Sequence, residues 1–185
     1  VGATQLGRWG KCKLATVAFG HGIATTLLQL SKGYSIISNG GYKITPTLLK
    51  KERLQRQRVL NENLSNKINP ILRKIVSTKE GTAGFANVKG YEIGGKTGTA
   101  DQPSKGGYSK KKVNTFTSVF PTSDPKFVLA VMLDEPKTSK DYIYHYRDGS
   151  NIKYKGTPFN TAGWTTVEVT GQIIENIGPI LATKY

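Results

Sequence analysis

Two strand-like segments joined by a short turn set the strongest limit on how this chain folds. Thr115–Phe120 precedes the turn and the apolar segment Phe127–Leu133 follows it. The connection, Pro-Thr-Ser-Asp-Pro at 121–125, consists of turn-forming residues, and a link this short joins antiparallel neighbours. The second segment is apolar on both faces, a pattern typical of a strand covered on both sides. The sequence therefore predicts an antiparallel sheet packed by helices, an α+β fold.

A third strand, Tyr91–Ala100, carries residues suited to chemistry. Its sequence is Tyr-Glu-Ile-Gly-Gly-Lys-Thr-Gly-Thr-Ala, with strand-forming side chains at Tyr91 and Ile93. In a strand, Lys96 and Gly98 would point to one face and the two threonines, at 97 and 99, to the other. A lysine and two hydroxyls beside a bare glycine edge suit a carboxylate or a developing oxyanion. We expect this tetrapeptide, Lys96–Thr99, at the rim of the sheet.

Three helices are predicted around these strands. Thr25 or Thr26 can cap the first, which carries an apolar stripe and ends at the glycines of 39–41. Asn69 followed by Pro70 predicts the start of the second, because proline is favoured at the first helical position. The third spans Thr161–Ile177, and its stripe of Val167, Thr170, Ile174 and Ile177 should pack on a sheet face.

Three other segments show no clear periodicity. Residues 101–112 are polar and predict a loop, while Lys50–Arg58 predicts an exposed excursion that is helical or disordered. The tyrosine-rich segment Tyr142–Tyr154 is either a flexible flap over the site or a surface hairpin, and the sequence does not separate these alternatives.

The charge balance permits one further class of partner. The chain has 185 residues and a formal net charge of +15, from 27 Lys and Arg against 12 Asp and Glu. Such a surplus permits attraction to nucleic acid or another anionic surface. The basic residues are spread along the chain, however, without a recognition-helix, zinc-finger or aromatic RNA-binding pattern. We therefore interpret them as a solvated lysine-rich surface and expect no nucleic-acid partner.

Isolated reactive residues give no sign of a metal or cofactor. The single cysteine, Cys12, excludes an internal disulfide and has no histidine or acidic residue close in sequence. His21 lies between two glycines without a carboxylate, so we interpret it as a loop histidine near the site. Asp134 and Glu135 are adjacent, which turns them to opposite faces of a strand and favours a solvated strand end over an acid/base pair.

Several motifs, in chain order, resemble one family. They cover most of the chain and look like the C-terminal part of the transpeptidase domain of class B penicillin-binding proteins, the group of the septal cell-division transpeptidase and its elongation relative. The residues that carry the resemblance are 18–23, Thr26, 29–30, 38–41, Pro46, 81–83, 95–100, 116–121, Pro125, Val131 and 134–136.

The resemblance implies a penicillin-binding-protein/serine β-lactamase-like fold and acyl transfer between peptidoglycan stem peptides, with β-lactams acylating the same serine. Lys96 would supply positive charge, Thr97 and Thr99 would bind the substrate carboxylate, Gly98 would allow close approach, and the Thr99 N–H would donate to the oxyanion. It further implies a bacterial inner-membrane protein whose domain faces the periplasm, with cell-division or elongation membrane proteins as partners. No cofactor is implied.

The chain departs from the family pattern at the nucleophile. The family serine lies in a helical Ser-x-x-Lys motif, and a second box is Ser-x-Asn. We interpret neither as present, since Ser31-Lys32 and Ser109-Lys110 have the wrong spacing. We therefore expect residues 1–185 to be the C-terminal portion of one transpeptidase domain, with the nucleophile upstream of Val1 and no activity alone.

Other functions stay open. A D-alanyl-D-alanine carboxypeptidase or a β-lactam sensor would share the Lys-Thr-Gly box. A basic nucleic-acid or anionic-surface binding module, or a non-catalytic scaffold, is the alternative from another class.

Overall fold

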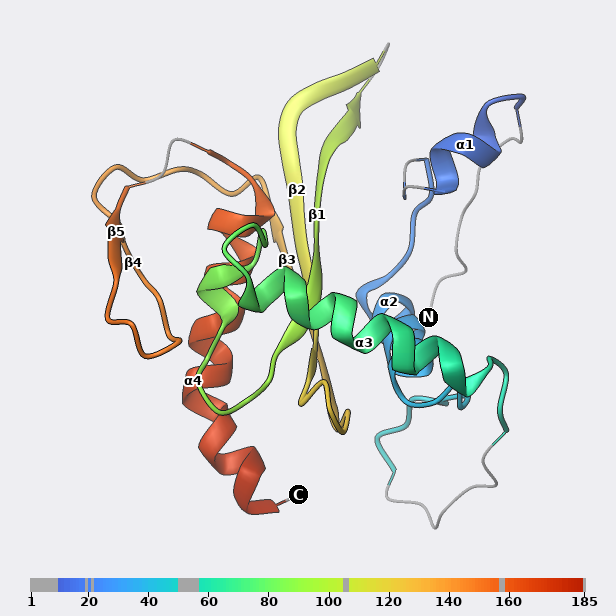
Figure 1. Cartoon of the computed structure of the whole chain (residues 1–185). Coiled ribbons are helices and arrows are strands. Elements are labelled where there is room, and N and C mark those ends of the chain that lie inside the picture. The colour runs from blue at the N-terminus through green and yellow to red at the C-terminus, as the bar shows by residue number, and fades with distance from the viewer. Residues whose placement is uncertain are drawn as a thin grey trace.

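The computed structural model describes residues 10–18, 20, 22–49, 57–104, 107–156 and 159–184. Within these residues, β1 (Gly94–Ser104), β2 (Gly107–Phe120) and β3 (Phe127–Asp134) form a sheet in the order β1-β2-β3. Both pairings are antiparallel (Figure 1). The prediction of an antiparallel sheet packed by helices is confirmed, and β1 lies at one edge of it.

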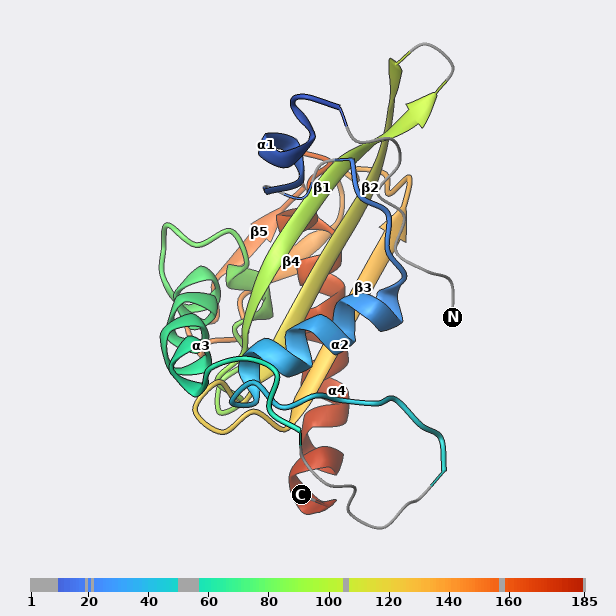
Figure 2. The same cartoon turned by 90° about the vertical axis from the view of Figure 1, so that its right-hand side faces the viewer.

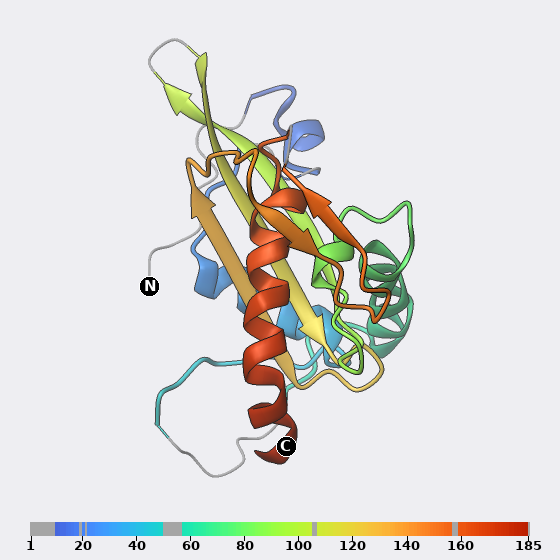
Figure 3. The ribbon, with the colours of Figure 1, turned by 90° about the vertical axis from the view of Figure 1, so that its left-hand side faces the viewer.

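Helices cover both faces of the sheet. α4 (Thr166–Lys184) crosses one face (Figure 3). α2 (Leu27–Ser38) crosses the other, and α3 (Glu62–Ser77) lies beside β1 (Figure 2). A short helix, α1 (Lys13–Ala18), precedes them.

β2 is the most deeply buried strand of the sheet. Its consecutive residues from Phe116 to Phe120 are all at most 3% exposed, whereas most of β3 is half-buried and Met132 is 47% exposed. Both α2 and α4 contact β3, so helices cover Phe127–Leu133 on both faces as predicted, although less completely than they cover β2. β2 is buried more deeply because it is the central strand, whereas β3 lies at an edge of the sheet.

The hydrophobic core lies between the sheet and α4. Phe116 of β2 packs there with Val167 and Ile174 of α4 and with Phe85 of the short helix η1 (Gly84–Ala86). Tyr144 closes the cluster from β4 (Ile143–His145) and is 4% exposed. The face of β1 that carries Thr97 borders this core, since Thr97 pairs with Phe116.

The β1–β2 ladder extends through residues predicted to be a loop. β1 continues to Ser104 and β2 begins at Gly107, so the prediction of a loop over 101–112 is wrong. Polar cross-strand pairs replace an apolar pattern here: Lys112 forms an ion pair with its register partner Asp101 at 2.9 Å. At its other end β1 starts at Gly94, so Tyr91 and Ile93 precede the strand, and Glu92 has a φ of 45°.

α2 begins and ends where the sequence predicts. Thr26 Oγ1 accepts a hydrogen bond from the Gln29 N–H at 3.2 Å, and Gln29 Oε1 accepts one from the Thr26 N–H at 3.0 Å. These two bonds form a capping box. The helix ends before Gly40 and Gly41, which have φ values of 87° and 84°.

α3 begins eight residues earlier than the proline signal predicts. Asn61 caps it, and Pro70 lies inside the helix, so the predicted start at Asn69 is wrong. Contacts with α2 hold the first half: Ser65 Oγ donates to the Ile37 carbonyl at 2.6 Å, and Asn69 Nδ2 donates to the Ser38 carbonyl at 3.1 Å. These bonds and the packing around them offset the hydrogen bond that proline cannot make.

The last helix is split at its start. Residues Ala162–Trp164 form a 3₁₀ turn, η2, and α4 follows from Thr166 to Lys184, so the predicted range Thr161–Ile177 is displaced at both ends. The predicted stripe is buried at Val167, Thr170 and Ile174, while Ile177 is 36% exposed.

The tyrosine-rich segment folds as a hairpin. β4 pairs antiparallel with β5 (Lys153–Lys155). The loop between them carries Arg147, whose guanidinium forms two hydrogen bonds, each 2.9 Å long, with the Glu168 carboxylate of α4. Burial lowers the pKa of Arg147, but the hydrogen bonds and charges of Glu168 and Glu175 outweigh it and raise the pKa. The hairpin is thus anchored to α4.

Some predictions lie outside the described residues. These include the placement of His21 and most of the segment 50–58. Cys12 is exposed. None of the helices in the described ranges is both long and apolar enough to span a bilayer.

Candidate active site

The four residues of the Lys-Thr-Gly-Thr sequence lie along the outer edge of the sheet. Residues 96–99 belong to β1, and Lys96 and Thr99 are exposed while Thr97 and Gly98 are half-buried. Their position at the rim is as predicted. The register pairs Thr97 with Phe116 and Gly98 with Thr115, so alternate residues face opposite sides of the sheet.

On the side away from the core lie Lys96 and Gly98. Lys96 Nζ donates a hydrogen bond to the Thr97 carbonyl at 2.8 Å. A Cβ placed on Gly98 would lie 2.5 Å from Thr115 Oγ1 on the neighbouring strand. A side chain at position 98 would therefore force the Thr115 side chain to move, whereas glycine avoids this contact and leaves the strand edge open.

On the other side, the hydroxyls of Thr97 and Thr99 meet groups from distant segments. Thr82 Oγ1 lies 3.1 Å from Thr97 Oγ1, and either hydroxyl can donate. The Ala162 N–H of η2 donates to Thr99 Oγ1 at 3.0 Å. The sequence analysis did not identify Thr82 as a site residue, although residues 81–83 belong to the segments that carry the family resemblance. No local pattern around Thr82 indicates that its hydroxyl meets that of Thr97.

These hydroxyls border a pocket between β1 and η2, which we call the threonine pocket. It has a volume of about 400 Å³. Its lining residues include no acidic side chain, lysine or arginine; they are Gly81, Thr82, Gly84, Phe85, Thr97, Thr99, Tyr146, Thr161, Ala162, Gly163 and Trp164. One wall is hydroxylic and the other aromatic, and Phe85, at 5% exposure, contributes little accessible surface.

The layer beneath Thr99 fixes η2 in place. Asn114, fully buried on β2 opposite Thr99, donates through Nδ2 to Thr165 Oγ1 at 2.9 Å. Thr165 Oγ1 in turn donates to the Thr161 carbonyl at 3.0 Å. This chain of bonds holds the turn that presents the Ala162 N–H to Thr99.

The aromatic wall is also rigidly packed. Trp164 lies 5.2 Å from Phe85, 5.1 Å from Tyr144 and 5.3 Å from Tyr154, measured between ring centroids. Such ring pairs restrict one another's rotamers. The pocket is therefore largely preformed.

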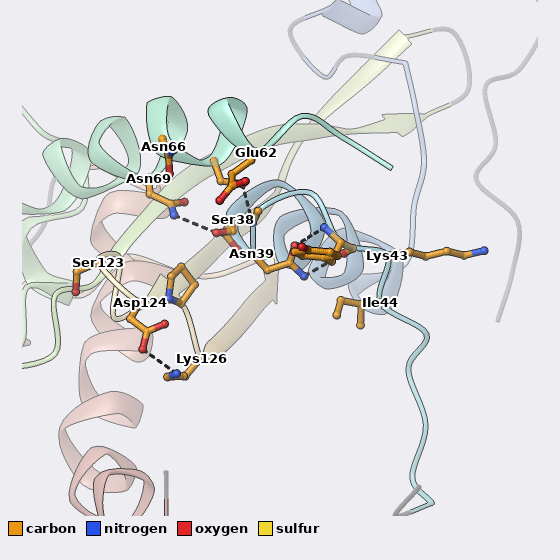
Figure 4. Close-up of a pocket in the computed structure, with 14 residues that line it drawn as sticks. Ser38, Asn39, Lys43, Ile44, Glu62, Asn66, Asn69, Ser123, Asp124 and Lys126 are labelled. Carbon is orange, nitrogen blue, oxygen red and sulfur yellow. Dashed lines mark hydrogen bonds and ion pairs between the residues drawn. The ribbon is translucent and has the colours of Figure 1, made fainter. Parts of the chain in front are cut away.

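A larger pocket of about 570 Å³ lies elsewhere, between the end of α2, α3 and the β2–β3 turn. Figure 4 shows that its polar side chains largely pair among themselves: Asp124 with Lys126 at 2.7 Å, and Asn69 Nδ2 with the Ser38 carbonyl. None of residues 96–99 lines it. We assign the chemistry to the edge of β1 and to the smaller pocket, because the hydroxyls of Thr97 and Thr99 line that pocket, while Lys96 lies on the opposite face of the same strand.

A serine nucleophile in the family arrangement is not formed by the described residues. Three tetrapeptides do have the Ser-x-x-Lys spacing, which corrects the interpretation that none occurs: Ser109–Lys112, Ser123–Lys126 and Ser150–Lys153. They lie in β2, in the β2–β3 turn and in the β4–β5 hairpin, not on a helix. A strand or turn does not bring residues i and i+3 together on one face as a helix does.

Comparisons with known proteins show which family this chain resembles. The penicillin binding protein transpeptidase domain family matches residues 2–151. The probable peptidoglycan D,D-transpeptidase FtsI of Caulobacter vibrioides is 31% identical over 96% of this chain, and stage V sporulation protein D of Bacillus subtilis is 34% identical over 71%. The chain belongs to the penicillin binding protein transpeptidase domain family.

Solved structures support the same assignment. The apo transpeptidase domain of Burkholderia pseudomallei penicillin-binding protein 3 matches with a TM-score of 0.77 and 27% identity over 97% of this chain. Penicillin-binding protein 3 from Mycobacterium, solved with ampicillin, matches with a TM-score of 0.68 and 25% identity over 92%. The chain spans 50% of the Burkholderia structure and 30% of the Caulobacter protein.

Proposed function

We propose that this chain forms the Lys-Thr-Gly wall of a serine-type peptidoglycan D,D-transpeptidase. The observation that carries the proposal is the open edge of β1, where Lys96 is exposed and the hydroxyls of Thr97 and Thr99 border a pocket. Family membership supports the reaction class.

The hydroxyl cluster suits the C-terminal carboxylate of a stem peptide. Thr99 Oγ1 accepts from the Ala162 N–H, which leaves its own O–H free to donate. Of the pair Thr82 and Thr97, one hydroxyl donates to the other, so one O–H is left over. A carboxylate only accepts hydrogen bonds, and two hydroxyl donors converge on it here.

Lys96 and the Thr99 backbone would act at the reacting carbonyl. In a strand, the C=O and N–H groups of residues 97 and 99 point to the same side. The Thr97 carbonyl accepts from the Lys96 ammonium, as a carbonyl on the open side of β1 can. The Thr99 N–H on that side would donate to the oxyanion, an interaction worth about 10²–10³ in rate.

The reaction itself is acyl transfer. A serine oxygen outside residues 1–185 attacks the penultimate D-alanyl carbonyl, the C–N bond breaks, and the terminal D-alanine leaves with a proton on its nitrogen. An amine of a second strand then attacks the ester, and the serine oxygen regains its proton. Residues 1–185 would supply binding and electrostatic stabilisation, and would be inactive alone.

The setting of the reaction follows from its substrate. We place the intact protein in the bacterial inner membrane with this domain in the periplasm, where peptidoglycan and β-lactams reach it. Cell-division or elongation membrane proteins would be its partners. A carboxypeptidase would use the same wall but hydrolyse the acyl ester.

The test uses the intact protein that contains this chain and a fluorescent penicillin. Lys96→Ala should slow acylation at least about 100-fold, since it removes the positive charge at the site. Its fold should persist, because Lys96 is exposed and its only described hydrogen bond is to the neighbouring carbonyl. The matched control is Lys110→Ala, an exposed lysine on β2. Equal acylation rates in the two variants would refute the role of Lys96. In a separate assay with stem peptides as substrate, hydrolysed rather than cross-linked products would indicate a carboxypeptidase.

A further inference from the structure

We propose that Asn114 is a positioning residue for the reaction, which acts through η2 to hold the Thr99 hydroxyl in place. Asn114 is fully buried on β2 and does not itself line the threonine pocket. Its role rests on the proposed function, because it presumes that the Thr99 hydroxyl binds the substrate carboxylate.

Asn114 is an unfavourable residue for its place in the core. Its side chain lies on the same face of β2 as that of Phe116, which belongs to the hydrophobic cluster. Among the described residues, two buried side-chain oxygens accept no hydrogen bond, and these are Oδ1 of Asn114 and Oδ1 of Asn69. A buried amide oxygen without a donor destabilises a fold, so its presence needs an explanation.

The neighbouring groups fix which way the Asn114 amide points. Its Nδ2 donates to Thr165 Oγ1 at 2.9 Å and lies 3.4 Å from Asn160 Oδ1. The Thr165 hydroxyl gives its proton to the Thr161 carbonyl, and Asn160 Nδ2 donates to the Pro136 carbonyl. Turning the Asn114 amide over would place its oxygen against two acceptors, so Oδ1 stays without a donor.

The same hydrogen bonds hold η2 from its inner side. Asn114 fixes the Thr165 hydroxyl, which holds the Thr161 carbonyl just before η2. Ala162, the first residue of η2, donates its N–H to Thr99 Oγ1 at 3.0 Å. Thr99 is exposed, so this bond rather than side-chain packing directs its hydroxyl. A shift of η2 would therefore turn the Thr99 hydroxyl away from a bound carboxylate.

The test compares two reactions of the intact protein that contains this chain: acylation by benzylpenicillin and acylation by its methyl ester, in which the carboxylate is masked. Wild type should react faster with the acid, because a hydroxyl donates more strongly to a charged carboxylate than to an ester. Asn114→Leu keeps the branched shape of the side chain and removes the amide. It should lower the acid-to-ester ratio of rates at least about tenfold, whereas general loosening of the fold would slow both reactions alike.

A second variant tests whether Asn114 acts through the bond to Thr165. Thr165→Val removes the other partner of that bond and should lower the ratio at least as much as Asn114→Leu. Because both changes break one chain of hydrogen bonds, the double variant should show no lower ratio than Thr165→Val alone.

The matched control is Asn69→Leu. Asn69 carries the other unpaired amide oxygen and also donates to a single backbone carbonyl, that of Ser38, but it lies on α3 outside the threonine pocket. Asn69→Leu should keep the wild-type ratio. Urea unfolding shows which of the variants are folded under the assay conditions.

The role of Asn114 is overturned by an unchanged ratio in Asn114→Leu or in Thr165→Val, or by an equal fall of the ratio in Asn69→Leu. If Asn114→Leu does not fold, the ratio of Thr165→Val decides. A wild-type protein that penicillin does not label, or that reacts equally with acid and ester, overturns the proposed function instead.

Discussion

Removing Arg147 should destabilise the protein more than removing any exposed cation. The side chains of Arg147 and Glu168 are 5% and 4% exposed and share two hydrogen bonds of 2.9 Å. Arg147 also donates to the carbonyls of Phe85 and His145, each at 3.0 Å. Arg147→Met would leave the Glu168 carboxylate buried with Tyr142 and Gln172 as its remaining partners.

The expected loss is about 3–5 kcal/mol, the usual cost of breaking a buried ion pair by removing one partner. Lys111→Met serves as control. Its ion pair with Glu135 has side chains 61% and 44% exposed, and an exposed pair contributes about 0–1 kcal/mol. Urea unfolding of the purified protein, followed by circular dichroism, measures both.

A second comparison separates the lost pair from an unpaired charge. If the loss of stability in Arg147→Met comes from leaving the Glu168 carboxylate buried without a cation, neutralising that carboxylate should reduce the loss. The double variant Arg147→Met/Glu168→Gln should then be more stable than Arg147→Met alone. The reasoning is refuted if Arg147→Met costs no more than the Lys111 control, or if the double variant is less stable than the single one.

Two further predictions concern β1 and the β4–β5 hairpin. Gly98→Ala should cost about 1–3 kcal/mol of stability through its clash with Thr115 Oγ1, and adding Thr115→Ala should restore stability. If a ligand must also approach the backbone at position 98 closely, penicillin will still acylate this double variant slowly. Acylation of the double variant at the wild-type rate would show that the edge of β1 does not need a glycine there. The Ser150 side chain and backbone N–H lower the pKa of Asp148 below its ordinary value of 3.8, so Ser150→Ala should raise that pKa in an NMR titration. A carboxyl group whose pKa is lowered in the folded protein stabilises the fold at pH values above its unfolded pKa, and this stabilisation is lost as the pH falls through its folded pKa. The Ser150→Ala protein should therefore lose less stability than wild type between pH 5 and pH 2. Identical stability profiles of the two proteins in this pH range would contradict the prediction.

Local sequence patterns predicted the elements whose signals are strong over a few residues. The capping threonine and glycine stop of α2 were correct, as were the proline-bounded turn and the edge position of Lys96–Thr99. Local patterns failed where tertiary contacts compete with them. Pro70 lies within α3, which packs against α2, and the polar strand ends at 101–112 are paired through charges across the ladder.

By itself the sequence determined how the residues of the proposed site are arranged locally, since a lysine, two threonines and a glycine at alternating positions need only a strand to be sorted onto two faces. The tertiary structure alone decided what those residues meet. Thr82 reaches Thr97 from 15 residues away and the Ala162 N–H reaches Thr99 from 63 residues away, and together they form one wall of a pocket. No local pattern encodes such contacts, because they form only when the sheet, η2 and α4 have packed around a common core.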